Sequence, residues 1–311
     1  MSLRRTAALA MKTLPQIDIL LIITALSFCR SRIFSFREIF SGKDRSRTVA
    51  AEKSPSNYKS FWDWTGHSIP PFYDAPSTQY YFECERQLFL SFFPDIAGKK
   101  VFKTDLWDEA KNTRILNWVA RQGAEVFGLD ISSQILAEAR RSFDISKGKL
   151  ACIVSDLRGI GFKDESFDLI YSMGTVEHFP EYRQAIRECF RVLRKGGKAI
   201  FGVPNKCDPF LRPLLVTLLN GLNLYAYGEE KSFGMKTFER LLGEAGFQII
   251  GRSGILFIPG WLRMLDLFMF VRWPGSRFGL APLVRPFAFL YRKFPLLRRQ
   301  GYLIVCVVQK P

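Results

Sequence analysis

The sequence has few of the residues that build metal and redox sites. Only two histidines, His67 and His178, occur in the chain, and its six cysteines form no C-x-x-C pair or other zinc spacing. We therefore predict no metal site. Cys152, Cys189 and Cys306 fall inside apolar strand or helix patterns, so we interpret them as reduced core residues of a protein in a reducing compartment.

The N-terminal apolar run is too short to span a bilayer. Residues 19–29 are broken only by Thr24 and Ser27. As a helix they would extend about 17 Å at roughly 1.5 Å per residue, against a hydrocarbon core of about 30 Å. Residues 1–16 are basic and contain no acidic residue. Three interpretations stay open: an anchor in the membrane interface, a cleaved leader of secretory or mitochondrial type, and a helix packed on the following domain.

Glycines are missing where a nucleotide-binding α/β fold normally has them. Residues 101–110 have the pattern of a buried strand, a tight turn and the start of a helix. In such folds the first turn holds the charged end of the ligand on backbone N–H groups and a helix N-terminus. Here mostly acidic residues occupy the turn, and the absence of a G-x-G-x-x-G motif argues against a nicotinamide-dependent dehydrogenase.

The net charge of +16 is concentrated in two segments. Residues 1–53 hold ten Lys or Arg against four Asp or Glu, and residues 253–300 hold eight against one. The second segment also carries ten aromatic residues. Because the positive charge accompanies apolar side chains while the rest of the chain is nearly neutral, an anionic membrane surface is favoured over nucleic acid as the partner. A helical subdomain or a dimer interface is the alternative for residues 253–300.

Strand and helix patterns alternate over residues 100–251, which predicts an α/β fold with a parallel sheet and crossover helices. The apolar segment 302–308 is expected to be a last buried strand, antiparallel to the sixth if residues 253–300 are an insertion between them. The first six predicted strands are Lys100–Thr104, Glu125–Leu129, Leu150–Ser155, Phe167–Ser172, Lys198–Val203 and Phe247–Gly251. The predicted helices among them are about Asp108–Arg121, Ser132–Phe143, Glu181–Leu193, Phe210–Tyr225 and Lys236–Ala245.

The chain is predicted to consist of a basic, apolar extension with a linker (1–58) and one domain (59–311). Residues 41–60 are polar and charged, as in a linker. Insertions are expected within the domain at about 205–229 and 253–300.

An aromatic-rich segment precedes the first strand and contains a predicted helix, Thr78–Phe93, with an apolar stripe. Two interpretations stay open: the helix covers the sheet, or it forms a lid over a substrate pocket. The residues that would lie near such a pocket are Tyr73, Asp74, Tyr80 and Tyr81.

Two predicted strands end in an aspartate. Asp130 follows the second strand and Asp156 the third. A carboxylate at the first position can accept hydrogen bonds from both hydroxyls of a ribose, and one at the second can accept from the exocyclic amine of an adenine. Either aspartate taken alone is also compatible with a helix cap.

Further motifs accompany the two aspartates. They are Val126–Ser132, Asp156 with Phe162, Phe167–Ser172, Val176–His178, Arg191–Gly197 and Phe247. On these residues the chain resembles class I S-adenosylmethionine-dependent methyltransferases, in the group that includes the quinone-biosynthesis C- and O-methyltransferases. The resemblance covers roughly residues 95–252, with a plausible last strand at 302–308. Its motifs are specific for the fold and say little about the methyl acceptor.

The resemblance implies a doubly wound, mostly parallel sheet of seven strands, a Rossmann-like fold that here carries hydrophobic helical insertions. It also implies S-adenosyl-L-methionine as the cofactor. The implied cofactor-binding residues are Asp130 and Ile131 at the ribose, Asp156 and Leu157 at the adenine, and Met173 and Gly174 after the fourth strand.

The first turn departs from the family pattern, which has an acidic residue at the end of strand one and then three closely spaced glycines. Lys103 takes the acidic position, and Asp105, Trp107 and Glu109 fall at or near the glycines. Side chains there obstruct close approach of a ligand to the backbone. Either Asp105 or Glu109 holds the ammonium of the cofactor and Lys103 its carboxylate, or cofactor binding has been lost.

His178 lies where some relatives have a histidine after strand four. It is the candidate catalytic residue, as a general base that needs only a modest pKa adjustment. The alternative is a structural hydrogen bond from its ring. Methyl transfer needs little acid–base help when the acceptor is already nucleophilic, because alignment of the acceptor supplies most of the effect.

The resulting hypothesis is a cytoplasmic methyltransferase, peripheral at the inner face of a membrane, that acts on a lipid-like or small-molecule acceptor. The competing hypothesis is a catalytically inactive methyltransferase-like protein that binds lipid or a partner through the same insertions. RNA methylation is a third and less favoured interpretation, since the catalytic region is nearly neutral.

Overall fold

The computed structural model describes residues 55–144, 146, 148–222, 225–273 and 279–311. The predictions for the apolar run 19–29 and for most of the linker lie outside these residues. Among the helices of the described residues, none combines the length and the apolar character that crossing a bilayer requires.

A seven-stranded sheet forms the centre of the fold, with the strand order β3-β2-β1-β4-β5-β7-β6. Neighbouring strands from β3 to β5 are parallel, whereas β7 is antiparallel to both of its neighbours. This confirms the predicted fold class and the predicted hairpin between the sixth and the last strand. The strands are β1 (Lys100–Lys103), β2 (Glu125–Asp130), β3 (Leu150–Val154), β4 (Phe167–Met173), β5 (Leu193–Pro204), β6 (Gln248–Ile255) and β7 (Leu303–Gln309).

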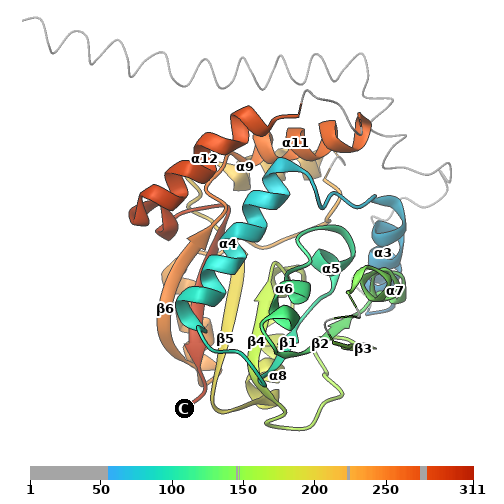
Figure 1. Cartoon of the computed structure of the whole chain (residues 1–311), viewed down its shortest axis with the longest axis vertical. Helices are drawn as coiled ribbons and strands as arrows, with labels where there is room; N and C mark the ends of the chain where they lie inside the picture. Colours follow the sequence, from blue (N-terminus) through green and yellow to red (C-terminus); the bar gives the residue numbers. More distant parts are fainter. Residues whose placement is uncertain (1–54, 145, 147, 223–224, 274–278) are drawn as a thin grey trace, which may run out of the picture. The chain divides into compact units, whose positions relative to one another are not determined.

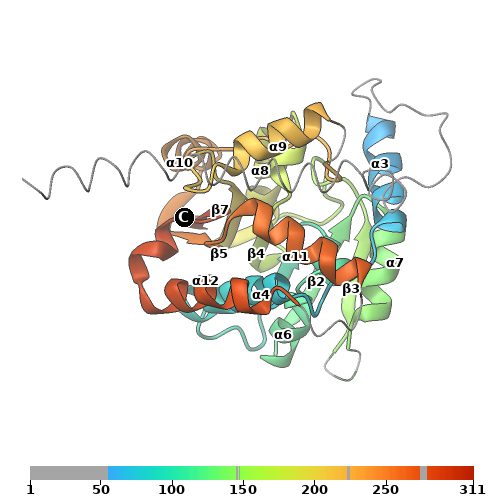
Figure 2. The ribbon, with the colours of Figure 1, turned by 90° about the horizontal axis from the view of Figure 1, so that it is seen from above.

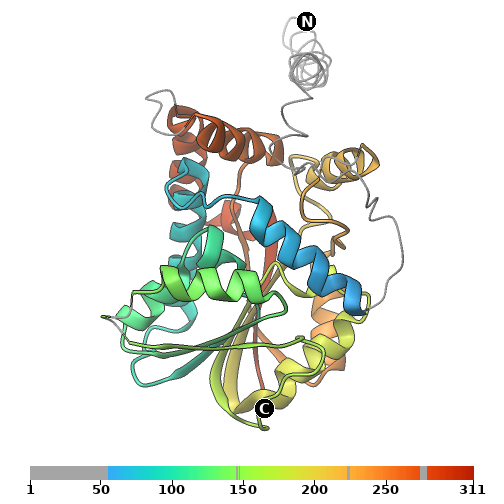
Figure 3. The ribbon, with the colours of Figure 1, turned by 90° about the vertical axis from the view of Figure 1, so that its right-hand side faces the viewer.

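Helices cover both faces of the sheet (Figure 3). Successive residues of a strand point to opposite faces, so Val305 and Val307 of β7 join one core while Ile304 and Cys306 join the other. Burial on both faces explains the unbroken apolar pattern of this strand. Helices α4 (Pro76–Phe92), α5 (Trp107–Lys111), α6 (Ile115–Arg121) and α7 (Ser133–Ser142) lie on the first face; α8 (Tyr182–Val192) and α10 (Met235–Glu244) lie on the second.

The aromatic segment before β1 forms a helix that packs on the sheet. Tyr80, Tyr81, Leu88 and Phe89 of α4 are buried in the first core. This packing is that of a covering helix, the first of the two interpretations. The cysteines predicted to lie in the core, Cys152, Cys189 and Cys306, are buried with free thiols.

Two sequence predictions about helices are wrong in detail. The helix predicted over 108–121 is two short helices, because Arg114 adopts a left-handed conformation (φ 56°) and both Asn112 and Arg114 donate their N–H groups to the carbonyl of Asp108. Residues 55–60, assigned to a linker by their polarity, begin α3 (Pro55–Ser68), which packs on α7.

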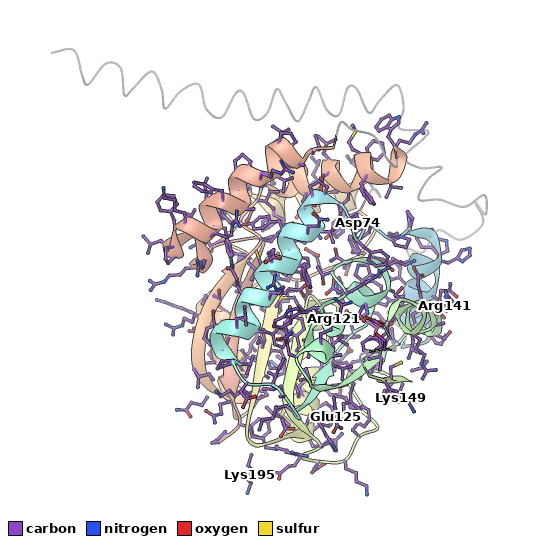
Figure 4. All side chains as sticks on the ribbon, viewed as in Figure 1. Asp74, Arg121, Glu125, Arg141, Lys149 and Lys195 are labelled. Atoms are coloured by element: carbon purple, nitrogen blue, oxygen red, sulfur yellow. The ribbon has the colours of Figure 1, made fainter. Side chains whose placement is uncertain are left out.

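Three further helices and a short 3-10 turn gather at one end of the domain (Figures 1 and 2). They are α9 (Arg212–Gly221), α11 (Gly260–Arg272), α12 (Ala281–Lys293) and η3 (Pro295–Arg299). Glu125, the first residue of β2, lies at the opposite end of the sheet (Figure 4), so the parallel strands direct their carboxyl ends toward the side on which these helices lie.

Candidate functional site

The turn after β1 lies among the carboxyl ends of the central strands. A Cβ at Gly128 of β2 would come within 2.5 Å of the Leu106 side chain, so the turn packs directly on the bare backbone of its neighbour. From Lys103 to Ala110 only Asp105 and Trp107 reach the surface, and every other residue is buried. The side chains of these two residues are therefore what the turn presents to a ligand.

Lys103 is the centre of a buried charge cluster beneath the turn. Its side chain is 0% exposed, and its Nζ donates to Asp105 Oδ1 at 3.2 Å and to Asp108 Oδ2 at 3.3 Å. Burial by itself would lower the pKa of Lys103, but the surrounding carboxylates outweigh it and hold that pKa above its ordinary value. The lysine is thus a permanent cation that orients the acidic residues of the turn.

Asp105 joins the turn to the end of β4. Its Oδ2 accepts a hydrogen bond from Thr175 Oγ1 at 2.6 Å, and the Trp107 N–H donates to its Oδ1 at 3.1 Å. Thr175 also contacts the hydroxyl of Thr104 at 3.0 Å. These bonds fix the conformation of a turn that has no glycine to define its path.

Asp130 ends β2 beside the same turn. Its two carboxylate oxygens accept the backbone N–H groups of Leu106 (2.9 Å) and Ser132 (2.8 Å). Burial raises the pKa of Asp130 to about 7, although the two N–H donors oppose this shift. Each oxygen retains a lone pair for a ligand hydroxyl. The neighbouring Ile131 is half-buried.

Asp156 follows β3, the neighbour of β2, and forms an ion pair. Arg158 donates its N–H to Asp156 Oδ1 at 2.8 Å, and its guanidinium lies 2.6 Å from Oδ2. Partial burial opposes ionisation, but the hydrogen bonds from Arg158 outweigh it and hold the pKa of Asp156 below its ordinary value. The following Leu157 is buried in the second core.

Glu109 turns away from the surface and caps a helix. Both of its carboxylate oxygens accept the Leu116 N–H at the start of α6, at 3.2 and 3.3 Å. The side chain of Glu109 is buried. It lies there because it accepts the Leu116 N–H, one of the N–H groups that a helix leaves unpaired at its first turn. Burial raises the pKa of Glu109 to about 7.

Replacement of Glu109 by glutamine is expected to stabilise the protein at pH 8 by about 1–3 kcal/mol and to have little effect at pH 4. Glutamine keeps one acceptor for Leu116 and removes a charge that burial disfavours. The folded-state pKa lies above the unfolded value of about 4.3, so the wild type loses stability as pH rises from about 4.3 to 7 and bears the whole cost above that range. Urea denaturation at both pH values measures this difference.

The control for this experiment is Glu125→Gln, at the exposed first residue of β2 (Figure 4). It should change stability by less than about 0.5 kcal/mol at either pH. An equal gain for Glu109→Gln at pH 4 and pH 8 would contradict the assignment of the raised pKa.

Trp107, predicted to fall at or near a glycine of the family pattern, belongs to an aromatic cluster. Its ring meets those of Trp62 in α3 and of Tyr227, with centroids 6.2 and 5.5 Å apart. Trp62 also packs edge-on against His178 at 5.1 Å. Trp62 was not identified from the sequence, because the residues of α3 were assigned partly to the linker and partly to the aromatic-rich segment that follows it. The apolar spacing Tyr58, Phe61, Trp62 was the available signal.

A second role of α3 was also missed. Asp63 of α3 accepts the hydroxyl of Ser132 at 2.6 Å, and Ser132 itself caps α7 by accepting the Ile135 N–H at 3.2 Å. Hydrogen bonds thus connect α3 to the residues that directly follow Asp130.

The segment after β4 combines a glycine turn with two titratable side chains. Gly174 has φ 73°, a conformation that other residues rarely adopt, and follows the buried Met173. Glu177 is buried, and one of its oxygens has no hydrogen-bond partner among the described residues. Burial raises its pKa well above the ordinary value.

His178 is half-buried, and its Nδ1 lies 3.2 Å from the carbonyl oxygen of Glu229. A carbonyl only accepts, so this bond assigns the proton to Nδ1. Burial lowers the pKa of His178, although the nearby Glu230 opposes this shift. A neutral ring bonded in this way leaves Nε2 as an acceptor. His178 is therefore compatible both with a general base and with a purely structural hydrogen bond.

Comparison with known proteins finds one matching domain model. Residues 110–201 match the model of a methyltransferase domain. The match begins at Ala110, directly after the divergent turn.

Two curated relatives and one solved structure illustrate the similarity. A protein of Mycolicibacterium smegmatis named as a probable S-adenosylmethionine-dependent methyltransferase is 28% identical over 46% of this chain and 51% of its own length. The ubiquinone biosynthesis O-methyltransferase of Rhizobium etli is 26% identical over 45% of this chain and 58% of its own. The chain thus spans between half and six-tenths of these relatives.

The solved structure comes from the complex between the Haloferax volcanii Trm112 methyltransferase activator and a methyltransferase. It matches with a TM-score of 0.54 at 16% identity, over 81% of this chain and 97% of that one. The domain match and the curated relatives support a class I S-adenosylmethionine-dependent methyltransferase family for this chain, and the solved structure shares its fold.

Proposed function

We propose that this protein is an S-adenosylmethionine-dependent methyltransferase that works at an anionic membrane surface on a lipid-like acceptor. One observation carries the first part: Asp130 ends β2 and Asp156 follows the neighbouring strand β3 at the carboxyl edge of the sheet. Open α/β sheets bind nucleotide ligands at this edge.

The nucleoside half of the cofactor fits the residues present. Asp130 keeps acceptor capacity for ribose hydroxyls beyond its two backbone donors. Asp156 is held ionised by Arg158 and remains partly exposed, so its carboxylate can accept from an adenine amine. Ile131, Leu157, Met173 and Gly174 complete the proposed lining.

The amino-acid half of the cofactor meets a different surface from the usual glycine cradle. Asp105 is the acidic residue of the turn that reaches the surface, so it is the proposed partner of the ligand ammonium. Lys103 is fully buried behind it and would act by orienting Asp105. Glu109, bonded to Leu116, would contribute only through the negative potential of the turn.

S-adenosylmethionine supplies a methyl group bound to a positively charged sulfur. The protein's task is to bind the nucleoside, to exclude water and to align the acceptor. Trp62 and Trp107 form an apolar wall next to His178, the proposed general base for an acceptor that must lose a proton.

The proposal of a lipid-like acceptor at a membrane is supported by the surface of the helical end, the end of the domain where α9, α11 and α12 lie. Twelve of the sixteen large hydrophobic side chains that are exposed among the described residues lie in the segments 211–222 and 261–296. Arg285, Arg292, Lys293 and Arg299 are exposed among them. We name this surface the basic–apolar face; such patches are typical of proteins that bind membranes. The name of the Rhizobium etli relative, a ubiquinone biosynthesis O-methyltransferase, is consistent with an isoprenoid-like acceptor.

A second candidate function rests on the turn itself. Trp107 and Asp105 occupy positions where the family has glycines, and a protein that had lost cofactor binding could retain the same fold and the same basic–apolar face. This candidate is a catalytically inactive lipid- or partner-binding protein.

Calorimetric titration with S-adenosylmethionine and S-adenosylhomocysteine separates the two candidates. The wild type is expected to bind, and Asp156→Asn to bind about tenfold more weakly, because a hydrogen bond to a charged acceptor contributes roughly 1.5–3 kcal/mol. The control is Asp144→Asn, another loop aspartate that accepts from a residue two positions on and pairs with an arginine, but lies after α7 rather than after a strand. No wild-type binding up to millimolar ligand would refute the methyltransferase proposal.

A further inference from the structure

The insertion helix α11 is connected to the cofactor turn by buried hydrogen bonds. Arg263 and Asp266 lie on the inner side of α11 and are 7% and 1% exposed, whereas Trp261 and Leu265 of the same helix face outward. Asp266 is the one acidic residue of segment 253–300. The charges of this pair are therefore directed into the domain.

Asp266 and Arg263 both contact the first turn of α4. Asp266 Oδ2 accepts the Ser77 N–H at 2.8 Å, one of the N–H groups that a helix leaves unpaired. Arg263 Nη1 donates to the Ser77 hydroxyl at 3.3 Å, and its guanidinium lies 5.3 Å from the Tyr81 ring centroid. The insertion thus fixes the N-terminus of the helix that covers the sheet.

The same arginine reaches the cofactor turn through one side chain. Arg263 Nη2 lies 3.5 Å from Asn112 Oδ1, which also accepts from Thr78 at 3.1 Å. The Asn112 amide donates to Asp108 Oδ1 at 2.7 Å. Asp108 in turn pairs with Lys103, which holds Asp105.

We propose that Arg263 is a positioning residue for the cofactor turn, acting through Asn112 and Asp108 on the Lys103–Asp105 pair. Glycines normally let such a turn follow the ligand by backbone conformation alone. Here the turn is held by side chains, and a part of that support comes from an element 151 residues away in sequence. The insertion therefore contributes to the cofactor site as well as to the outer surface.

The charge balance supports this connection. Burial raises the pKa of Asp108, and Lys103 is its one ion-pair partner among the described residues. Arg263 is a second buried cation that reaches the same cluster through Asn112.

The test compares Arg263→Gln with Arg272→Gln, which removes the same charge from the exposed end of α11. Hydrogen exchange of residues 104–112 should become about tenfold faster in Arg263→Gln and stay unchanged in the control. Affinity for S-adenosylhomocysteine should fall about tenfold in the first variant only. Arg263→Lys retains the charge but lacks the planar guanidinium. Its exchange rate and its affinity should lie between those of the wild type and of Arg263→Gln.

A double-mutant cycle with Asn112→Ala distinguishes positioning from general support. If Arg263 acts through Asn112, the double variant should bind S-adenosylhomocysteine no more weakly than Asn112→Ala alone. Fully additive losses, or unchanged exchange at 104–112, would overturn the proposal. The cofactor readout rests on the proposed function: if the wild type does not bind, that function fails, and the exchange rates of Arg263→Gln and Arg263→Lys still decide whether this residue positions the turn.

Discussion

Replacement of Lys103 by methionine is expected to destabilise the protein by about 3–5 kcal/mol at pH 7.5, the effect of removing one partner from a buried ion pair. Asp105 and Asp108 would lose their shared cation while remaining mostly or fully buried. The folded-state pKa of Lys103 is raised, so its contribution persists through the neutral range and disappears only above about pH 10. Urea denaturation of wild type and variant measures the difference.

The loss of stability caused by Lys103→Met should become smaller as the pH falls toward 5. Burial already raises the pKa of Asp108, and without the lysine this carboxyl is protonated at still higher pH, which relieves the unpaired charge. Lys103→Met/Asp108→Asn should be more stable than Lys103→Met at pH 7.5 for the same reason. Lys100→Met, three residues earlier on β1 and only half-buried, is the control and should cost less than about 1 kcal/mol. A Lys103→Met deficit that does not change with pH would contradict the charge-cluster interpretation.

Removal of three positive charges from the basic–apolar face is expected to weaken binding to phosphatidylserine vesicles by about two orders of magnitude. Arg285, Arg292 and Lys293 are exposed on α12, and each basic residue near an anionic bilayer contributes about 1 kcal/mol. Vesicle sedimentation of the whole chain carrying Arg285→Gln/Arg292→Gln/Lys293→Gln provides the measurement. Added salt should weaken the wild type in the same direction.

The matched control removes three positive charges at other places in the domain. Arg141, Lys149 and Lys195 are exposed and lie away from the helical end (Figure 4). Their replacement by glutamine lowers net charge equally and should leave vesicle binding within a few-fold of wild type. Equal losses in both variants would show that net charge alone governs binding and would remove the basic–apolar face as the docking surface.

Apolar contact with the bilayer has a separate signature. Leu283 and Phe289 are about half exposed on α12. Their replacement by glutamine should weaken binding to neutral phosphatidylcholine and to anionic vesicles by the same factor, because burial of apolar area does not depend on headgroup charge. The three-charge variant should lose binding only to anionic vesicles.

The succession of strands and helices along the chain was predictable from local patterns, since each element carries its own periodicity and termini. Asp130 ends β2 and Asp156 follows β3, as expected, and β7 pairs with β6 as its apolar pattern suggested. Ser132, the first residue of the predicted helix 132–143, caps α7. Each of these features depends on a few adjacent residues, which is why the sequence is enough to locate them.

The site was only partly predictable. The acidic turn was predicted to be a divergent cofactor turn. Its internal pairing was not predictable, because Lys103, Asp105 and Asp108 can each find a partner only after the chain is packed. The break between α5 and α6 depends on the same turn, since Asp108 accepts from two residues beyond the helix end. Helix α3 was not predicted either, because its first residues are polar and were assigned to a linker. Its stability comes from packing on α7 rather than from an apolar periodicity of its own.

The sequence by itself determined the succession of strands and helices, the positions of the two aspartates that follow strands two and three, and the absence of glycines from the turn. The tertiary structure decided which side chains support that turn: Thr175 from the end of β4 and, through Asn112, Arg263 from the insertion. It also decided that one of the insertion's basic residues faces inward while others remain on the surface. Periodicity and caps act between neighbours in the chain, whereas the pairing of buried charges depends on contacts between residues far apart in sequence.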